Sequence, residues 1–555
     1  MADLIKVVNM IPKMSSGETN QDSEPNLAVN PENPLEMAGT AFTPSTNVGS
    51  PNSPVYYSND GGNTWRLRDI IAGTPVRDQT VRFATTGGML YAGVLWGPGG
   101  LSTINFDILR TKDFSGLTQM TQVGPSRTND DQPFVQAATV PSGPDAGKDR
   151  VYVGSNDHAP ANVPATMDLS LDAAAAAPVT STFVLEARTV GRDGFPTRPA
   201  VHPDGTVYAI FYATVGPGTT SDVVIVRDDN WASSATPFLA LIDTGDSKQG
   251  VRIVTGVNDP YNGLTLGQQR IGSDLSVAVD PSDSSIVYVC YGDFSTGTYI
   301  LHVRKSTDSG ANWSSDLRAV SNATNPALAV DAAGTLGFLY QHVTGIAPNQ
   351  RWVTTFEHTK NDFASVITRY LANTPAATPL AAGNPYLGDY LYMLALDRTF
   401  YGIFSANNTP DLGNFPNGVT YQRNANFTTH KLLANDNVTP VAVSIDPFFF
   451  KIAVDFPTVV TAIADSGSFG DVCVGSFKDE ILTIDNSGTG PLLISNITGS
   501  LDFLAPSVLS YPIKVEAGGS VDVVIRFQPG SLGFKAGTIT IFSDDPASPH
   551  IVQNS

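Results

Sequence analysis

The chain alternates short hydrophobic runs with polar turns, and one such arrangement recurs along most of its length. Seven segments open with a polar or charged residue and continue as a hydrophobic run, as in Glu24-Pro-Asn-Leu-Ala-Val29. Runs of this length predict half-buried and fully buried β-strands. These first strands begin on average about 61 residues apart, which suits a repeated four-stranded unit. They start at Glu24, Gln79, Gln132, Arg198, Asp274, Asn325 and Asp389. A second predicted strand follows each, at Glu36–Phe42, Met89–Trp96, Arg150–Ser155, Thr206–Ala213, Ser285–Gly292, Thr335–His342 and Thr399–Ser405.

A polar turn pattern, S-x-D-x-G-x-x-W, occurs twice after a third strand. In such a turn the Ser and Asp side chains bond backbone N–H groups, and Gly adopts a positive φ. The Trp ring then packs on the neighbouring sheet. The pattern therefore predicts structural hairpin turns without a catalytic role. The residues are Ser58, Asp60, Gly62 and Trp65 in one copy and Ser306, Asp308, Gly310 and Trp313 in the other.

These two turns resemble the Asp-box, or BNR repeat, of the sialidase-like β-propellers. The resemblance implies an all-β propeller whose Asp-boxes lie on the face away from the active site. Seven repeats predict a seven-bladed β-propeller over residues 1–437, and six blades are the alternative because family sialidases have six. We expect the strand Leu4–Met10 to pair with the last blade and close the ring.

The pattern changes after the seventh repeat. Residues 438–458 are hydrophobic and rich in proline, and we expect them to be a connector. From residue 459 to 555, strands and turns alternate as in an immunoglobulin-like β-sandwich, whose last strand we expect to be incomplete. This part resembles the ASH-type, or choice-of-anchor D, module of bacterial secreted and surface proteins. The resemblance implies a separate domain through which a protein partner could bind.

Composition narrows the classes of function. The 555 residues carry a net charge of −20, which disfavours nucleic acid and anionic membranes as partners. No hydrophobic run reaches the length of a membrane span, and the N-terminus lacks a signal-peptide pattern. The family resemblance implies an extracellular or cell-surface protein. Export without a signal peptide and a cytoplasmic pool are the alternatives.

Propeller connectivity indicates where a functional site should lie. The first strand of each blade starts, and the second strand ends, on one face near the axis. Side chains at these positions should converge on a central site. The candidates for catalysis are Asp131, Asp157, His158, Arg198, Tyr212 and Asp389. The candidates for ligand binding are Glu24, Trp96, Asp274, Asp293, His342 and Asn407.

These residue types fit several kinds of site. Two carboxylates can hydrolyse a glycosidic bond, and a histidine with Tyr212 can abstract a proton, as in polysaccharide lyases. Asp157 and Asp389 can hold a metal ion, for which we expect Ca²⁺. A solvated axial channel without chemistry is a further alternative. Because gathered carboxylates repel one another, we expect either such an ion or Arg198 within the cluster.

One position disfavours a true sialidase. The family has an arginine in the inner strand of the first blade and binds the sialic acid carboxylate with three arginines. Here that strand begins with Glu24, and the pattern places neither Arg82 nor Arg270 near the axis. We therefore expect a sialidase-like propeller that recognises a glycan or polysaccharide. A glycoside hydrolase or polysaccharide lyase, and a protein-interaction scaffold or cargo of a secretion machine, are the alternatives.

Overall fold

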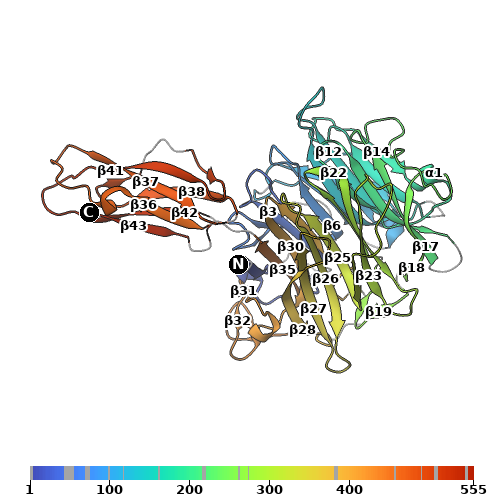
Figure 1. Cartoon of the computed structure of the whole chain (residues 1–555). Helices are drawn as coiled ribbons and strands as arrows, with labels where there is room; N and C mark the ends of the chain where they lie inside the picture. Colours follow the sequence, from blue (N-terminus) through green and yellow to red (C-terminus); the bar gives the residue numbers. More distant parts are fainter. Residues whose placement is uncertain are drawn as a thin grey trace. The chain divides into compact units, whose positions relative to one another are not determined.

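The computed structural model describes residues 4–42, 55–68, 76–97, 100–116, 118–159, 163–215, 220–260, 263–272, 274–379, 386–454, 458–488, 490–505, 510–543, 545 and 548–555. The chain divides into two compact units (Figure 1), residues 6–451 and residues 1–5 with 452–555. Both units are built from β-strands, and the described part holds a single α-helical turn, α1 (Glu186–Thr189). None of the described helices has the length and hydrophobicity that a membrane crossing needs.

Seven successive sheets of four or five strands make up most of the larger unit, counted over the described residues. Their first strands are β2 (Ser23–Val29), β6 (Val76–Phe83), β11 (Asp130–Thr139), β15 (Arg198–Val201), β21 (Leu275–Asp280), β25 (Ala323–Val330) and β29 (Tyr392–Leu396). Their second strands are β3 (Met37–Phe42), β7 (Leu90–Trp96), β12 (Asp149–Asp157), β16 (Val207–Thr214), β22 (Asp283–Asp293), β26 (Leu336–Thr344) and β30 (Thr399–Asn407). The predicted second strands are thus confirmed to within two residues at either end.

The outer strands complete six of these sheets. They are β4 (Val55–Ser58), β5 (Arg66–Arg68), β8 (Asn105–Thr111), β9 (Thr121–Gln122), β10 (Arg127–Thr128), β13 (Ala165–Ser170), β14 (Thr180–Val184), β17 (Thr220–Asp228), β18 (Val251–Asn258), β23 (Ile300–Ser306), β24 (Arg318–Ser321), β27 (Arg351–Thr359) and β28 (Ile367–Pro375). Hydrophobic side chains of adjacent sheets share a core, as where Tyr208 and Ile225 pack with Val287 and Val289.

The first strands contact one another in a closed cycle. β2 lies against β6, and the contacts continue through β11, β15, β21 and β25 to β29, which returns to β2. The polar beginnings of these strands are therefore gathered at one end of a common axis. This arrangement of antiparallel sheets around an axis is that of a β-propeller.

The last sheet of the cycle joins the two ends of the larger unit. Its strand order is β29-β30-β35-β1-β31, with β1 (Leu4–Asn9), β31 (Thr420–Tyr421) and β35 (Ile445–Ala453). The expected pairing of the N-terminal strand with the last sheet is confirmed. The prediction that residues 438–458 form a connector is wrong, because β35 lies inside the sheet with Phe448, Phe449 and Phe450 fully buried. A strand that is buried on both faces has a continuous hydrophobic sequence without alternation. From its sequence alone, this segment therefore resembles a connector between the domains.

The two S-x-D-x-G-x-x-W turns have the same hydrogen bonds. The Ser58 hydroxyl donates to Asp60 (2.8 Å) and accepts from the Gly62 amide (3.0 Å). The Ser306 hydroxyl contacts Asp308 (2.8 Å) and Gly310 (2.9 Å) in the same way. Both glycines have positive φ, +79° and +84°. Trp65 is buried against Phe449 of the last sheet, with ring centroids 5.3 Å apart, so this turn connects the first and last sheets.

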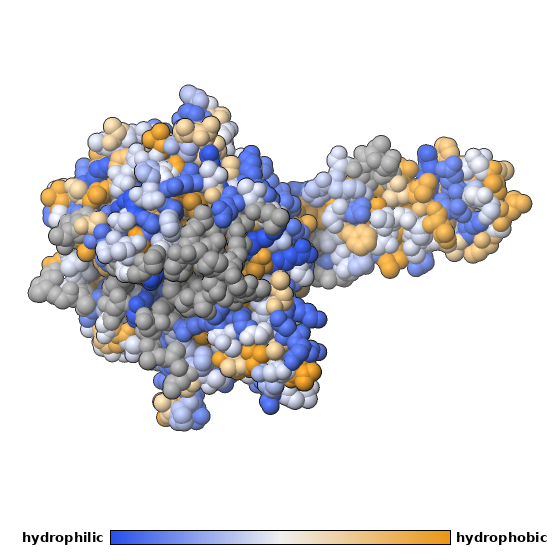
Figure 2. All heavy atoms as spheres, turned by 180° about the vertical axis from the view of Figure 1, so that it is seen from behind, coloured by the Kyte–Doolittle hydropathy of each residue, from blue (hydrophilic) through white to orange (hydrophobic). Residues whose placement is uncertain are grey.

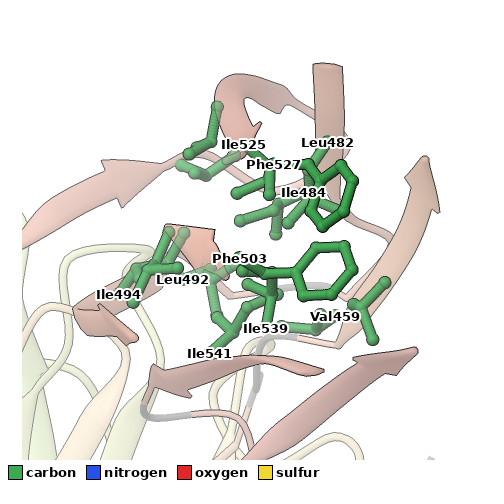
Figure 3. Close-up of a cluster of buried hydrophobic side chains, with 14 of the residues drawn as sticks. Val459, Leu482, Ile484, Leu492, Ile494, Phe503, Ile525, Phe527, Ile539 and Ile541 are labelled. Carbon is green, nitrogen blue, oxygen red and sulfur yellow. The ribbon is translucent and has the colours of Figure 1, made fainter. Parts of the chain in front are cut away.

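The smaller unit holds two four-stranded sheets around one hydrophobic core. One sheet has the order β36 (Val459–Ile463), β37 (Lys478–Asn486), β41 (Ser520–Phe527) and β39 (Phe503–Leu504). The other has the order β40 (Ile513–Val515), β38 (Leu492–Gly499), β42 (Gly537–Ser543) and β43 (His550–Asn554). Side chains such as Ile484, Ile494 and Phe503 point toward one another between the sheets (Figure 3). The surface of this unit also exposes hydrophobic residues in several patches (Figure 2).

Candidate axial site

One polar residue from each first-strand segment forms what we call the axial ring. At the beginning of four of these strands the register shifts, as between Ser23 and Asn26 or between Asp131 and Phe134. Such β-bulges redirect a side chain at the end of a strand and are common beside active sites. All seven members are buried despite their polarity. The axial ring consists of Glu24, Gln79, Gln132, Arg198, Asp274, Asn325 and Asp389.

Four carboxyl groups lie close together at the mouth of the ring. The Glu24 carboxyl is hydrogen-bonded to that of Asp78 and to that of Asp389. Burial and the neighbouring Asp78 and Asp389 charges raise the pKa of Glu24 well above its usual range. Burial and the charge of Asp131 raise the pKa of Asp78 to about 8. This shift favours the protonated form of Glu24, which can donate a hydrogen bond or a proton.

Two arginines offset the charge of these carboxylates. Arg270, from the hairpin of β19 (Thr265–Leu266) and β20 (Gln269–Arg270), forms an ion pair with Asp389. The Gln132 amide donates to Asp389 at 2.8 Å, and Arg198 donates to the Gln132 carbonyl oxygen at 3.3 Å. The arginine in direct contact with the cluster is Arg270, whereas Arg198, the arginine expected there, contacts Gln132. Burial lowers the pKa of Arg198 to about 10.

Asp274 occupies a different environment within the ring. Its carboxylate accepts hydrogen bonds from the Thr324 hydroxyl and the Asn325 amide, both at 2.8 Å. Burial raises the pKa of Asp274 to about 6 despite these donors. This carboxylate is therefore fixed by the next sheet, and its role is to position Asn325.

Several buried polar atoms at the site have no hydrogen-bond partner among the described residues. They include Nε2 of His158 and the hydroxyl of Tyr390. Burial and the charge of Asp389 raise the pKa of Asp131, and the neighbouring His158 opposes this rise. Buried polar groups in native proteins are nearly always paired, so unpaired ones indicate a place where a ligand or water binds.

Close packing of the backbone holds the cluster in place. A Cβ on Gly388 would lie 2.2 Å from the Glu24 amide nitrogen, and Gly388 has φ +108°. A Cβ on Gly272 would lie 2.5 Å from the Asp389 carboxyl carbon. Glycine is required at both positions because any side chain would displace the carboxyl groups.

The space along the axis below the ring is small. It measures about 40 Å³ for the centres of water-sized molecules and is lined by residues such as Phe134, Ser276 and Tyr392. That volume holds a few waters and excludes a sugar ring. A larger ligand would therefore contact the site from its outer side, where Asp131 and His158 are partly exposed.

The structure brings together half of the predicted candidates. Glu24, Asp131, His158, Arg198, Asp274 and Asp389 belong to the axial site described above. Asp157 lies apart from them, in an ion pair with Arg127 at 2.8 Å. The Tyr212 hydroxyl is bonded to the backbone of Asp274 and Gly292, at 3.0 and 2.9 Å, so its role is structural.

The remaining candidates have partners elsewhere. The Trp96 indole donates to Asp107 at 2.6 Å, and Asp293 accepts from the Asn258 amide at 2.8 Å. Asn407 donates to the Thr378 carbonyl. His342 lines a groove between two sheets. Their side chains follow the strand alternation, which points every second residue between sheets instead of toward the axis.

A metal site formed by Asp157 and Asp389 is not favoured by these contacts, since each carboxylate has a different arginine. Among the described residues, the carboxylates close enough to share an ion are Glu18, Asp22 and Asp446. Arg423 contacts two of them, with Nη1 at 2.8 Å from Glu18 and 2.9 Å from Asp446. The guanidinium supplies the positive charge that an ion would otherwise provide.

Three contributors to the site were not among the candidates from the sequence. Tyr390 flanks a strand beginning that the repeat identified, and Gln132 is itself such a beginning. A polar residue followed by proline marks several of these positions, as in Glu24-Pro25 and Gln132-Pro133. This dipeptide could have identified the axial positions from the sequence. No sequence pattern could have identified Arg270, because it comes from a hairpin outside the repeat.

No protein-family model and no curated protein matches the chain. Distant similarity to solved structures is found. A GH74 enzyme of Niastella koreensis is 12% identical over 99% of this chain and 86% of its own, with a TM-score of 0.39. An α-L-arabinanase of Penicillium chrysogenum, complexed with arabinobiose, is 14% identical over 80% and 98%, with a TM-score of 0.38. Drosophila Semaphorin 2a is 11% identical over 72% and 73%, also with a TM-score of 0.38.

Proposed function

We propose that this protein is a seven-bladed β-propeller with an immunoglobulin-like module, and that it binds a glycan at the axial site. The observation that carries the proposal is the group of unpaired buried atoms, His158 Nε2 and the Tyr390 hydroxyl, beside the four carboxyl groups. Carboxylates accept hydrogen bonds from sugar hydroxyls, and a protonated carboxyl or tyrosine donates to them. The site thus offers both kinds of partner that a polyhydroxylated ligand needs.

The same group of carboxyls favours hydrolysis as a second candidate function. Glycosidases require one carboxyl that is protonated at neutral pH and another that is ionised. The raised pKa of Glu24 favours the protonated state. We assign the ionised role to Asp131, which lies at the partly exposed edge beside His158, where the histidine opposes the rise that burial and Asp389 cause in its pKa. In this scheme Glu24 protonates the glycosidic oxygen, and Asp131 activates water or attacks the sugar.

Binding is tested by isothermal titration with neutral arabino-, xylo-, cello- and galacto-oligosaccharides. We expect Asp131→Asn and His158→Ala to lower affinity about tenfold or more, because each removes a buried or partly buried polar contact. Asp145 is a surface carboxylate away from the axial site, so the control variant Asp145→Asn should bind like the parent. Unchanged affinity in both axial variants would refute the axial assignment.

Hydrolysis is tested separately with chromogenic glycosides of the sugar that binds. Glu24→Gln should abolish turnover while retaining affinity, because glutamine keeps the donor and loses the transferable proton. If the parent protein binds the sugar but does not hydrolyse the glycoside, the hydrolase candidate is rejected and a lectin-like binding function is retained. Added Ca²⁺ and chelator are included as arms, since an ion at the axial carboxylates would raise the melting temperature.

A further inference from the structure

A second candidate site lies between the fifth and sixth sheets, outside the axis. It is a groove with a volume of about 360 Å³ for the centres of water-sized molecules, bordered by β24 on one side and by β26, β27 and β28 on the other. The latter three strands lie side by side (Figure 1). The groove is roomier than the axial cavity and is open to solvent.

The register of the sixth sheet determines which side chains face the groove. Tyr340 pairs with Thr355, which pairs with Tyr370, so these three residues form one row across the sheet. Glu357 pairs with Thr368 in the adjacent row, and His342 lies two residues beyond Tyr340 on the same face. Residues directly opposite in an antiparallel pair share a face.

The floor of the groove is a fully paired carboxylate. Glu357 is 2% exposed, and it accepts from Arg318 Nε at 2.9 Å and Nη2 at 2.6 Å. The Tyr340 hydroxyl donates a third bond, at 3.0 Å. The negative charge is therefore cancelled by a bidentate guanidinium, and the floor carries no net charge.

Neutral polar groups and an exposed aromatic ring surround this floor. The His342 ring lies 5.5 Å from that of Tyr340, and burial lowers the pKa of His342, which is therefore neutral at pH 7 with one donor and one acceptor. Tyr370 is 49% exposed, and the hydroxyls of Ser321, Thr344 and Thr368 line the same groove. An anion would find the guanidinium already paired and the imidazole uncharged.

We propose that this groove binds a neutral saccharide, with a sugar face against the Tyr370 ring and hydroxyls bonded to His342. An exposed tyrosine offers a large flat surface with two rotatable angles, and neutral imidazole matches hydroxyl groups in both bonding directions. The groove is separate from the axial site and does not depend on the function proposed for it.

The test is ligand-detected NMR with neutral oligosaccharides of arabinose, xylose, glucose and galactose, and with sialyllactose and inorganic phosphate as charged probes. The protein used is Asp131→Asn/His158→Ala, which combines the two changes expected to weaken binding at the axial site. Tyr370→Ala should weaken binding of a neutral sugar about threefold to tenfold. Ile367→Ala is the matched control, since Ile367 is 44% exposed on the same strand and faces the opposite side.

Two histidine variants sharpen the result. His342→Gln keeps a donor and an acceptor and should bind like the parent, whereas His342→Phe should lose affinity while staying folded. The proposal is overturned if no neutral sugar binds the axial double variant. It is also overturned if Tyr370→Ala and Ile367→Ala bind equally, or if the charged probes bind in preference.

Discussion

The carboxyl group of Glu24 is hydrogen-bonded to that of Asp78, although the two residues come from the first strands of different sheets. Two ionised carboxylates could not remain so close in a buried environment. One proton must therefore be shared between them, and the contact of β2 with β6 holds the pair together. The closure of the ring thus creates the acidic character of the site.

This pair should make stability depend on pH. The folded-state pKa of Asp78 is raised from 3.8 to about 8, so its protonated form stabilises the fold. That contribution is complete below pH ~4 and is lost as the pH rises toward 8. We expect the free energy of unfolding to fall over this range in urea titrations. Asp78→Asn should flatten the fall, and a slope identical to that of the parent would contradict the assignment.

The first S-x-D-x-G-x-x-W turn should be sensitive to any side chain at Gly62. A Cβ there would lie 2.2 Å from the Phe449 ring, and φ is +79°. We expect Gly62→Ala to cost about 1–3 kcal/mol from overpacking in addition to backbone strain. Gly297 has the same φ with nothing near its Cβ position, so Gly297→Ala measures the strain alone. Equal losses in the two variants would show that the contact with Phe449 is unimportant.

The carboxylate of these turns acts through hydrogen bonds more than through charge. A third turn has Thr359 and Asn361 in place of Ser and Asp, and the Asn361 carbonyl accepts from the Ser365 amide at 2.9 Å. Asp308 makes the same bond to the Asn312 amide at 2.9 Å. We expect Asp308→Asn to cost less than about 0.5 kcal/mol and Asp308→Ala about 1 kcal/mol in thermal unfolding. Equal losses of stability in Asp308→Asn and Asp308→Ala would contradict the claim that the hydrogen bonds of Asp308 matter more than its charge.

The buried ion pairs of Arg423 should contribute strongly to closure of the ring. Its guanidinium is fully buried and contacts Glu18 from the N-terminal segment and Asp446 from β35. Arg423→Met would leave both carboxyls buried without a partner cation, at a cost of about 3–5 kcal/mol. The exposed pair of Arg526 and Asp479 is the matched comparison, and Arg526→Met should cost far less because solvent screens both charges. Similar losses for both arginines in denaturant titrations would contradict the role in closure.

The sequence by itself determined the repeat, the strands and the turns, because these depend on local periodicity and on residues that bond their own backbone. The polar beginnings at Glu24, Gln132 and Asp389 were visible for the same reason. The hydrophobic run at Phe448–Phe450 was visible too, but its place inside a sheet depends on β1, which lies at the other end of the chain. Local pattern carries no information about such a distant partner.

Only the tertiary structure decided which polar residues meet. Asp389 and Arg270 form an ion pair because a hairpin between two sheets extends toward the axis, and no periodicity predicts that. His342 satisfied the same sequence rule as His158, yet the twist and alternation of β26 turn it into the groove beside Glu357. A position on a strand fixes the end of the sheet at which a residue lies. The direction of its side chain follows from packing against the next sheet, which forms only when the ring has closed.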